Sequence, residues 1–333
     1  MKKRTLWKKV TSILACTAMF VVMAAGCGST DTADGNSSSD SSGDSKVYKI
    51  GVSTQGWKNE FIKNAVNALE KLDEEMDNVE LVMVDSDDSV EQQLSDVDTL
   101  IAQGVDGLLF DCLSTEGSSS AVTACKTVGI PVVEFIAYTE NEDYETFVGT
   151  DVKSSGVMAM DVAAEAIGEE GNVFEIQGTI GHSGQINRGA GIAEALENYP
   201  NIELVESQSG EFSKDTAMSI TEAWLTKYPE GEIDAIIAHN DQMALGALNA
   251  CIAANRTEIK IVGIDGDLEA LQAVADGSMA GTIVDYCEEE CRLALEEMVS
   301  ILEGNEPQGE ILVDYVPVTD AEGAQEFIDM RSE

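Results

Sequence analysis

Basic residues are scarce in this chain of 333 residues, which has 19 Lys and Arg side chains against 62 Asp and Glu. The formal net charge of -43 repels nucleic acid and anionic membrane surfaces, so neither is expected as a partner. Histidine is rarer still, with only His182 and His239. The sequence has no zinc-ligand spacing, no G-x-S-x-G elbow and no calcium-loop pattern. We therefore expect no catalysis, no metal and no cofactor.

Cysteine is also sparse, and none of the seven residues forms a C-x-x-C pair. Cys16 and Cys27 lie near the N-terminus, and the odd remainder is Cys112, Cys125, Cys251, Cys287 and Cys291. A disulfide framework or a zinc site is therefore unsupported, and a single disulfide stays open. Cys287 and Cys291 are four positions apart on an expected helix, which predicts that both are buried as small apolar groups.

One apolar run, from Val10 to Ala25, lies near the N-terminus. Basic residues precede it, and it is too short and too one-sidedly flanked for a permanent membrane span. It predicts a secretory signal over residues 1–26, ending in Ala24-Ala25-Gly26-Cys27. This ending resembles a bacterial lipobox, which implies that Cys27 is lipidated and becomes the mature N-terminus; the alternative is an ordinary signal peptide with an incidental Cys.

Residues 27–45 are almost all small or polar, which is typical of a flexible tether. The mature protein is therefore expected on the outer face of the cell membrane, held there only by its acyl chains. It keeps 14 basic and all 62 acidic side chains, and acidic faces of this kind suit a soluble exported protein.

Short β-branched runs alternate with amphipathic stretches from Val47 onward. The expected strands are YKIGVS, VELVMVD, VDGLLFD and IPVVEF, all buried, followed by NVFEIQ, IELVES, IDAIIA, IKIVGID and AGTIVD. Helical spacing occupies residues 59–75, 90–103, 118–128, 154–167, 186–198, 214–227, 244–254 and 268–275, with Ser89-Val-Glu-Gln92 as a capping box. The alternation predicts two doubly wound α/β lobes with parallel sheets.

Polar residues stand where the expected strands end, and ligands of parallel α/β sheets bind at those ends. They are Ser53, Asp85, Asp111, Gln177, His239, Asn240, Asp241, Asp265 and Asp285. Carboxylates and amides above apolar strands suit hydrogen bonds to the hydroxyls of a small polar ligand. For any single Asp, an N-cap of the following helix is the alternative.

Six segments resemble one family: GVSTQGWKNEFIKNAVNAL, VDGLLFD, GIPVVEF, GQINRGAGI, DAIIAHNDQMALGAL and IVGIDGDLEALQAVADGSMAGTIV. They are similar to the class I, ribose/galactose-type sugar-binding proteins of ABC importers, here in a lipoprotein form. The resemblance implies two Rossmann-like lobes joined by a three-strand hinge that closes on ligand. One lobe would be residues 46–150 with 286–313, the other 151–285 with 314–333.

The resemblance also implies aromatic contacts to the ligand. Phe61 stands in Asn59-Glu60-Phe61-Ile62, where the family has an aromatic pair, and it is expected to stack on a sugar face. Trp57 is a candidate for the missing second ring, the alternative being a partly exposed surface residue. Phe212 matches an aromatic that covers the ligand.

Polar contacts carry over in the same way. Arg188 matches an arginine that grips ring or hydroxyl oxygens, and Asn240 and Asp265 match the amide and carboxylate that bind adjacent hydroxyls. Asp285 stands where the family often has Gln. The family's usual Asp-Arg pair is replaced by Phe135-Ile136-Ala137-Tyr138, so that Tyr138 offers one hydroxyl and the paired charge is lost. A pentose other than ribose, an inositol, a sugar derivative, a signal furanose or a cationic ligand therefore stays open.

The sequence thus predicts a monomeric binding lipoprotein that delivers a sugar-like ligand to ABC permease subunits, with the ATPase subunit engaged only indirectly. A hydrolase built on His182 or His239 lacks a motif, and a sugar-responsive transcription regulator lacks its helix-turn-helix. A binding protein that docks on a sensor kinase or chemoreceptor remains the alternative, because it would use the same lobes.

Overall fold

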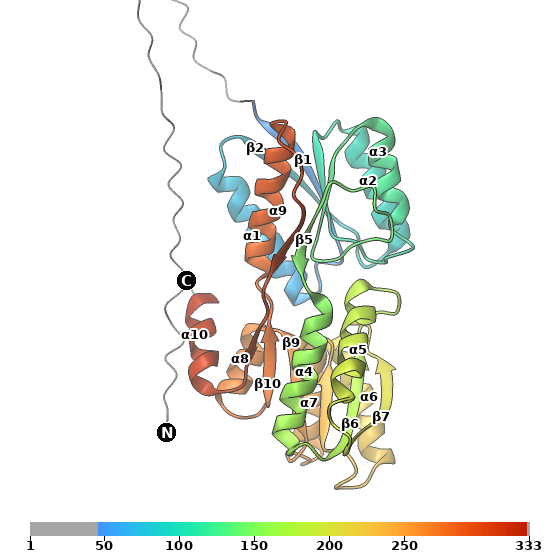
Figure 1. Ribbon diagram of the computed structural model, residues 1–333, viewed down its shortest axis with the longest axis vertical. Coiled ribbons are helices and arrows are strands. Elements are labelled where there is room, and N and C mark those ends of the chain that lie inside the picture. Colours follow the sequence, from blue (N-terminus) through green and yellow to red (C-terminus); the bar gives the residue numbers. More distant parts are fainter. Residues whose placement is uncertain (1–45, 332–333) are drawn as a thin grey trace, which may run out of the picture. The chain divides into compact units, whose positions relative to one another are not determined.

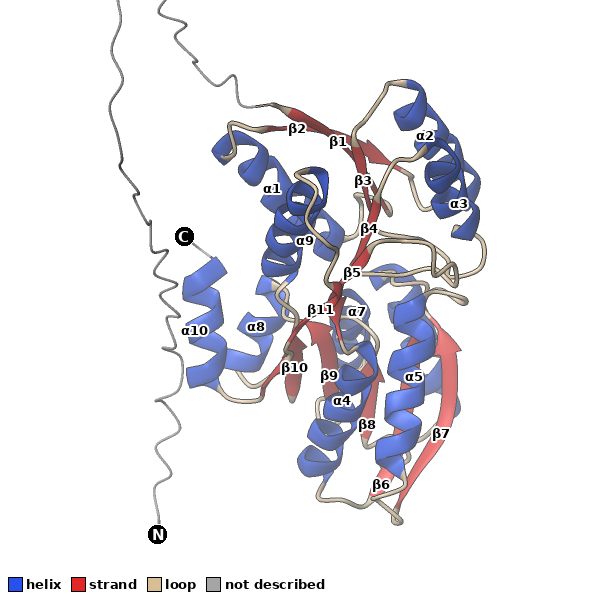
Figure 2. Cartoon of the chain, turned by 45° about the horizontal axis from the view of Figure 1, so that its top comes forward, coloured by secondary structure: helices blue, strands red, loops and turns tan. Residues whose placement is uncertain are grey.

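The structure is a computed structural model that describes residues 46–331. The expected signal at 1–26, the lipidated Cys27 and the tether at 27–45 lie outside the described residues. Two six-stranded sheets, each covered by helices on both faces, form the described part of the chain (Figures 1 and 2).

The first sheet is entirely parallel, with strand order β11-β5-β4-β3-β1-β2. Its strands are β1 Tyr48–Thr54, β2 Val79–Asp85, β3 Gly107–Phe110, β4 Val132–Phe135, β5 Thr146–Thr150 and β11 Gly309–Val313. Its helices are α1 Glu60–Glu75, α2 Val90–Ala102, α3 Ser119–Val128 and α9 Cys287–Leu302. Apolar side chains of α1 and α9 pack on one face of the sheet, and those of α2 and α3 pack on the other.

The second sheet has strand order β12-β10-β9-β8-β6-β7. Its strands are β6 Gly171–Gln177, β7 Ile202–Ser209, β8 Ala235–Ala238, β9 Lys260–Asp265, β10 Gly281–Val284 and β12 Val316–Val318. Its helices are α4 Val152–Ile167, α5 Ser183–Leu196, α6 Lys214–Lys227, α7 Asp241–Ala253, α8 Leu268–Ala275 and α10 Ala321–Arg331. Pairing is parallel except between β10 and β12, so the expectation of purely parallel sheets is wrong at this edge.

The expected doubly wound α/β architecture is confirmed, with differences at the margins. The stretch VELVMVD forms edge strand β2 and is largely half-exposed, so the expectation that it is buried is wrong. At the start of α2, Ser89 accepts a hydrogen bond from the backbone N–H of Gln92 at 3.2 Å, as the capping box predicts. The Gln92 side chain instead donates to Asp96, so only half of the box forms.

The chain crosses between the two sheets at three places, which lie close together in Figure 1. The crossings fall between β5 and α4, between β10 and α9, and between β11 and β12. Arg331, at the end of α10, donates to the backbone carbonyl oxygens of Gly266 and, at 2.8 Å, Asp285. Its Nε also lies 3.7 Å from the carboxylate of Glu288 on α9. The last helix is therefore tied to the crossing between β10 and α9.

The five described cysteines are free and buried. Cys287 and Cys291 face the core under α9, as the spacing predicts, and Cys291 Sγ donates to the Ala65 carbonyl at 3.6 Å. Within residues 46–331, no helix has the length and apolar character needed to cross a membrane.

Candidate functional site

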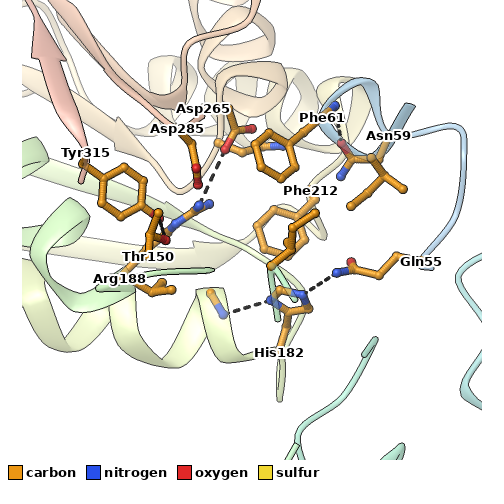
Figure 3. Close-up of a pocket in the computed structure, with 15 residues that line it drawn as sticks. Gln55, Asn59, Phe61, Thr150, His182, Arg188, Phe212, Asp265, Asp285 and Tyr315 are labelled. Atoms are coloured by element: carbon orange, nitrogen blue, oxygen red, sulfur yellow. Dashed lines mark hydrogen bonds and ion pairs between the residues drawn. The ribbon is translucent and has the colours of Figure 1, made fainter. Parts of the chain in front are cut away.

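A pocket of about 470 Å³ lies between the two sheets, where the strand ends meet the crossings. It is lined by Gln55, Asn59, Phe61, Ile62, Ile136, Thr150, Val152, His182, Gly184, Arg188, Phe212, Asn240, Asp265, Asp285 and Tyr315. Figure 3 shows the side chains of both lobes converging on one space.

Two aromatic rings come from opposite lobes. Phe61 is in the first turn of α1, where Asn59 caps the helix by accepting from the Phe61 N–H at 3.0 Å. Phe212 lies in the loop before α6 with φ of 56°, and its ring packs edge-on against His182 at 5.1 Å. A Cβ at Gly178 would lie 2.1 Å from Cζ of Phe212, so only glycine leaves room for this ring. Both rings are available for stacking on an apolar ligand face.

Arg188 supplies the positive charge of the pocket. It comes from α5, is buried, and donates through Nη1 to the carbonyl oxygen of His239. Its Nη2 lies 3.6 Å from Oδ1 of Asp265, the last residue of β9. The pKa of Asp265 is raised well above its usual range, mainly because the carboxyl is buried. The charge of Arg188 opposes this shift, whereas nearby carboxyls, Asp267 foremost, add to it. The pair is thus loosely joined, and both partners keep hydrogen-bonding capacity for a ligand.

Three buried polar atoms of lining residues have no hydrogen-bond partner within residues 46–331: Arg188 Nε, Asn240 Nδ2 and Asp285 Oδ1. Asn240 uses its other amide atom to cap α7, because Oδ1 accepts from the Met243 N–H at 2.9 Å. Buried polar atoms are normally satisfied, so unpaired ones around a pocket indicate a polar ligand. Together they offer two donors and one acceptor.

Glu290 lies behind Asp285 on α9 and is itself buried. Burial, the charge of Asp285 and a hydrogen bond with Asp285 raise the pKa of Glu290 well above its usual range. The raised pKa favours the neutral form of Glu290 beside Asp285.

On the side of the first sheet, Gln55 follows β1 and links the lobes. Its side-chain amide lies 2.7 Å from Oδ1 of Asp111 and 3.0 Å from Nε2 of His182. Burial and the charge of Arg188 lower the pKa of His182 to about 3, so this imidazole is neutral. Its Nδ1 caps α5 by accepting from the Gly184 N–H at 2.9 Å. His182 thus has a positioning role in this network.

Ile136 occupies a strained turn at the pocket wall. The Ala137 N–H donates to the Phe135 carbonyl at 2.6 Å, which closes a three-residue turn with Ile136 at its centre and φ of 62°. A left-handed backbone costs an L-residue roughly 1–2 kcal/mol, and a β-branched side chain tolerates it poorly. The buried Glu134 carboxylate holds the next residues by accepting from Thr139 N–H and Oγ1.

Phe212 and Asp265 also have positive φ, so three of the eight described non-glycine residues in this conformation line the pocket. Backbone strain of this kind concentrates at binding sites. This observation supports the pocket as the functional site independently of its polar groups.

Six of the sequence-predicted ligand contacts lie together around the pocket: Phe61, Arg188, Phe212, Asn240, Asp265 and Asp285. Asp111 lies outside it, fully buried, where it supports Gln55. Trp57 also lies outside it, and its Nε1 donates to Oγ1 of Thr54 at 2.8 Å. Tyr138 lines a separate hollow and accepts from Asn187 Nδ2 at 2.9 Å.

Several lining residues were missed by sequence reasoning. Gln55 lies two positions beyond Ser53, a recognised strand end. Thr150 and Tyr315 belong to β5 and to the last crossing, and the Thr150 hydroxyl donates to the Tyr315 oxygen at 2.7 Å. The sequence pattern did not predict β5 or β12, so it gave no indication that Thr150 and Tyr315 line the pocket.

Two α/β lobes with an aromatic and polar pocket at their junction define a two-lobed solute-binding protein. The sequence matches the family described as periplasmic binding protein domain over residues 50–306. The chain therefore belongs to the periplasmic binding protein domain family, as the resemblance predicts.

Individual relatives agree with this assignment. The xylitol-binding protein of Mycolicibacterium smegmatis is 33% identical over 274 residues, 82% of this chain and 75% of that protein. The ribose import binding protein of Bacillus subtilis is 31% identical over 301 residues, 90% of this chain and 95% of that protein. A solute binding protein of an ABC transporter from Bacillus halodurans, solved with bound myo-inositol, has a TM-score of 0.81 at 27% identity and covers 86% of this chain and 99% of its own. These relatives are binding proteins rather than enzymes.

Proposed function

We propose that this protein captures a sugar or sugar-like polyol between its lobes and delivers it to an ABC importer outside the cytoplasmic membrane. The observation that carries the proposal is the pairing of Phe61 and Phe212 with unpaired polar atoms on Arg188, Asn240 and Asp285. Stacking rings suit the C–H faces of a sugar, and the polar atoms suit its hydroxyls. The relatives that bind xylitol and myo-inositol support this chemistry.

The charges of the pocket disfavour anionic ligands. Asp265 and Asp285 face one cation, Arg188, and burial together with the neighbouring carboxyls raises the pKa of Asp265, so negative charge is disfavoured here. A phosphate or carboxylate on the ligand would meet two acidic side chains in a low-dielectric space. Sugar phosphates and sugar acids are therefore expected to bind poorly.

The direct test is calorimetric titration of the purified protein with xylitol, myo-inositol, D-ribose, D-allose, L-arabinose and D-galactose, with D-ribose 5-phosphate and D-galacturonate as the anionic counterparts of D-ribose and D-galactose. We expect one neutral compound to bind with micromolar or tighter affinity and to raise the melting temperature. Arg188→Met is the matched loss-of-binding variant, and Arg256→Met, outside the pocket, is its control. Binding of an anionic compound in preference to its neutral parent would contradict the proposal.

Delivery and anchoring need tests in the cell. Deletion of the gene is expected to abolish uptake of the radiolabelled ligand, whereas loss of a transcriptional response with unchanged uptake would favour a role on a sensor kinase or chemoreceptor. Cys27→Ala is expected to release the protein from the membrane fraction. A Cys27→Ala protein that stays membrane-bound would contradict the lipid anchor.

A further inference from the structure

The two walls of the pocket differ in chemistry. The wall from the side of the first sheet has no charged side chain among the described lining residues and includes Phe61, Ile62 and Ile136. The facing wall holds Arg188, Asp265 and Asp285. A ligand between them meets charged side chains on one side only.

The polar side chains of the first wall each make a hydrogen bond or close contact within the protein. Gln55 contacts Asp111 and His182 with one end of its amide, and Asn59 caps α1. The Thr150 hydroxyl donates to Tyr315. In contrast, the three unpaired buried atoms around the pocket, within residues 46–331, all belong to the facing wall.

The backbone at Ile136 is held in place on this uncharged wall. Its backbone N–H donates to the Val148 carbonyl at 3.1 Å, the following N–H closes the turn, and Glu134 secures Thr139. A β-branched residue does not adopt a φ of 62° without such constraints. The backbone at Ile136 is therefore fixed, and its apolar side chain lines the pocket.

We infer that Ile136 is a specificity-determining residue that selects a ligand with a carbon lacking a hydroxyl, such as a 6-deoxy sugar, over its fully hydroxylated parent. This inference rests on the proposed function and names the substrate class within it. A hydroxyl placed against Ile136 and Ile62 would lose its water without gaining a partner. The facing wall binds the hydroxyls of the opposite edge through Arg188, Asn240 and Asp285.

The test compares sugars that differ by one hydroxyl. The purified protein is titrated calorimetrically with L-fucose against L-galactose, D-fucose against D-galactose, L-rhamnose against L-mannose, and 5-deoxy-D-ribose against D-ribose. For the pair that binds, the deoxy member is expected to bind about 10- to 100-fold more tightly, which is the range over which an apolar pocket rejects an added hydroxyl. Equal or tighter binding of the hydroxylated member would overturn the inference.

Variants at Ile136 separate specificity from folding. Ile136→Asn places an amide at the wall, and Asn tolerates a positive φ, so the preference is expected to shrink or reverse. Ile136→Gly relieves the backbone strain and removes the wall, so discrimination is expected to fall even if Ile136→Asn does not fold. Ile252→Asn, at an exposed position on α7, is the control and is expected to keep the wild-type preference.

The outcomes distinguish this inference from the proposed function. Tight binding of a fully hydroxylated sugar with unchanged selectivity in Ile136→Gly would refute the role of Ile136 and leave sugar capture standing. Binding of none of the neutral compounds in either titration series would refute both.

Discussion

Substitution of Asp265 by Asn tests the polar wall most directly. The change replaces a carboxyl group by an amide of the same size, and the native residue at this φ of 124° is itself not glycine. A hydrogen bond between neutral groups contributes about 0.5–1.5 kcal/mol, and the raised pKa of Asp265 favours its neutral form, so two ligand hydroxyls on this carboxyl amount to about 1–3 kcal/mol. The Asn amide still makes one of these bonds, which leaves an expected loss of about 1–1.5 kcal/mol, roughly a 10-fold increase in Kd.

The stability of the unliganded protein is expected to change little in Asp265→Asn. Arg188 keeps its bond to the His239 carbonyl, and the repulsion between Asp265 and the carboxyls of Asp267, Asp241 and Asp285 disappears. Calorimetry gives the Kd of the best ligand, and a thermal melt without ligand gives the stability. Asp215→Asn, at an exposed site in the first turn of α6, is the matched control. A Kd within threefold of wild type in Asp265→Asn would refute the assigned role.

Three further predictions address the elements that support the site. Gly178→Ala is expected to displace the Phe212 ring, since the new Cβ would lie 2.1 Å from Cζ, and to weaken sugar binding by about 1 kcal/mol or more, measured by calorimetry. Glu134→Gln is expected to change the pH dependence of stability: burial raises the Glu134 pKa from 4.5 to about 7, so the stability that this carboxyl contributes is lost as the pH rises from 4.5 to 7. Relative to wild type, the variant should therefore gain up to about 3 kcal/mol across that window in urea unfolding. Ser89→Ala is expected to cost about 1 kcal/mol of unfolding free energy through loss of the α2 cap.

Each of these predictions has a control. Gly323→Ala, on α10, meets no atom closer than 3.4 Å and is expected to leave binding unchanged. The groups His182 and Asp111 also titrate, but they are present in both proteins, so the difference between wild type and Glu134→Gln isolates Glu134. A pH-independent difference would refute the assignment to Glu134. Unchanged stability in Ser89→Ala would show that the cap contributes nothing.

The helices and strands were largely predictable, because their buried faces require apolar residues at regular intervals along the sequence. Strands β1, β3 and β9 are rich in apolar residues and almost wholly buried, and helices alternate with the strands as expected. The full length of α9 was not predicted, although its apolar positions recur at helical spacing, because buried Glu290 and Glu297 interrupt the pattern. The strands β11 and β12 are short, half-exposed and adjacent to the crossings, so packing gives them no clear period.

The site residues that stand at the ends of strands were predictable from the sequence. Those whose position depends on a strained turn in the folded protein were not. Asp265, Asp285 and Asn240 end or follow buried strands, so the topology alone brings them together. In contrast, the turn at Ile136 forms because Glu134 and Val148 hold it, and both contacts are made only in the folded protein. A hydrophobic residue in such a turn has no local signature.

The contact between Arg331 and the Asp285 carbonyl has a practical consequence for building a fluorescent sensor from this protein. The end of α10 holds the backbone of Asp285, which lines the pocket. A reporter domain fused directly after α10 would strain this contact and so disturb the ligand binding that the sensor is meant to report. A dye on an engineered surface cysteine avoids this problem, because the five native cysteines of residues 46–331 are buried. The dye is then best attached at the pocket rim, with no domain fused to the C-terminal helix.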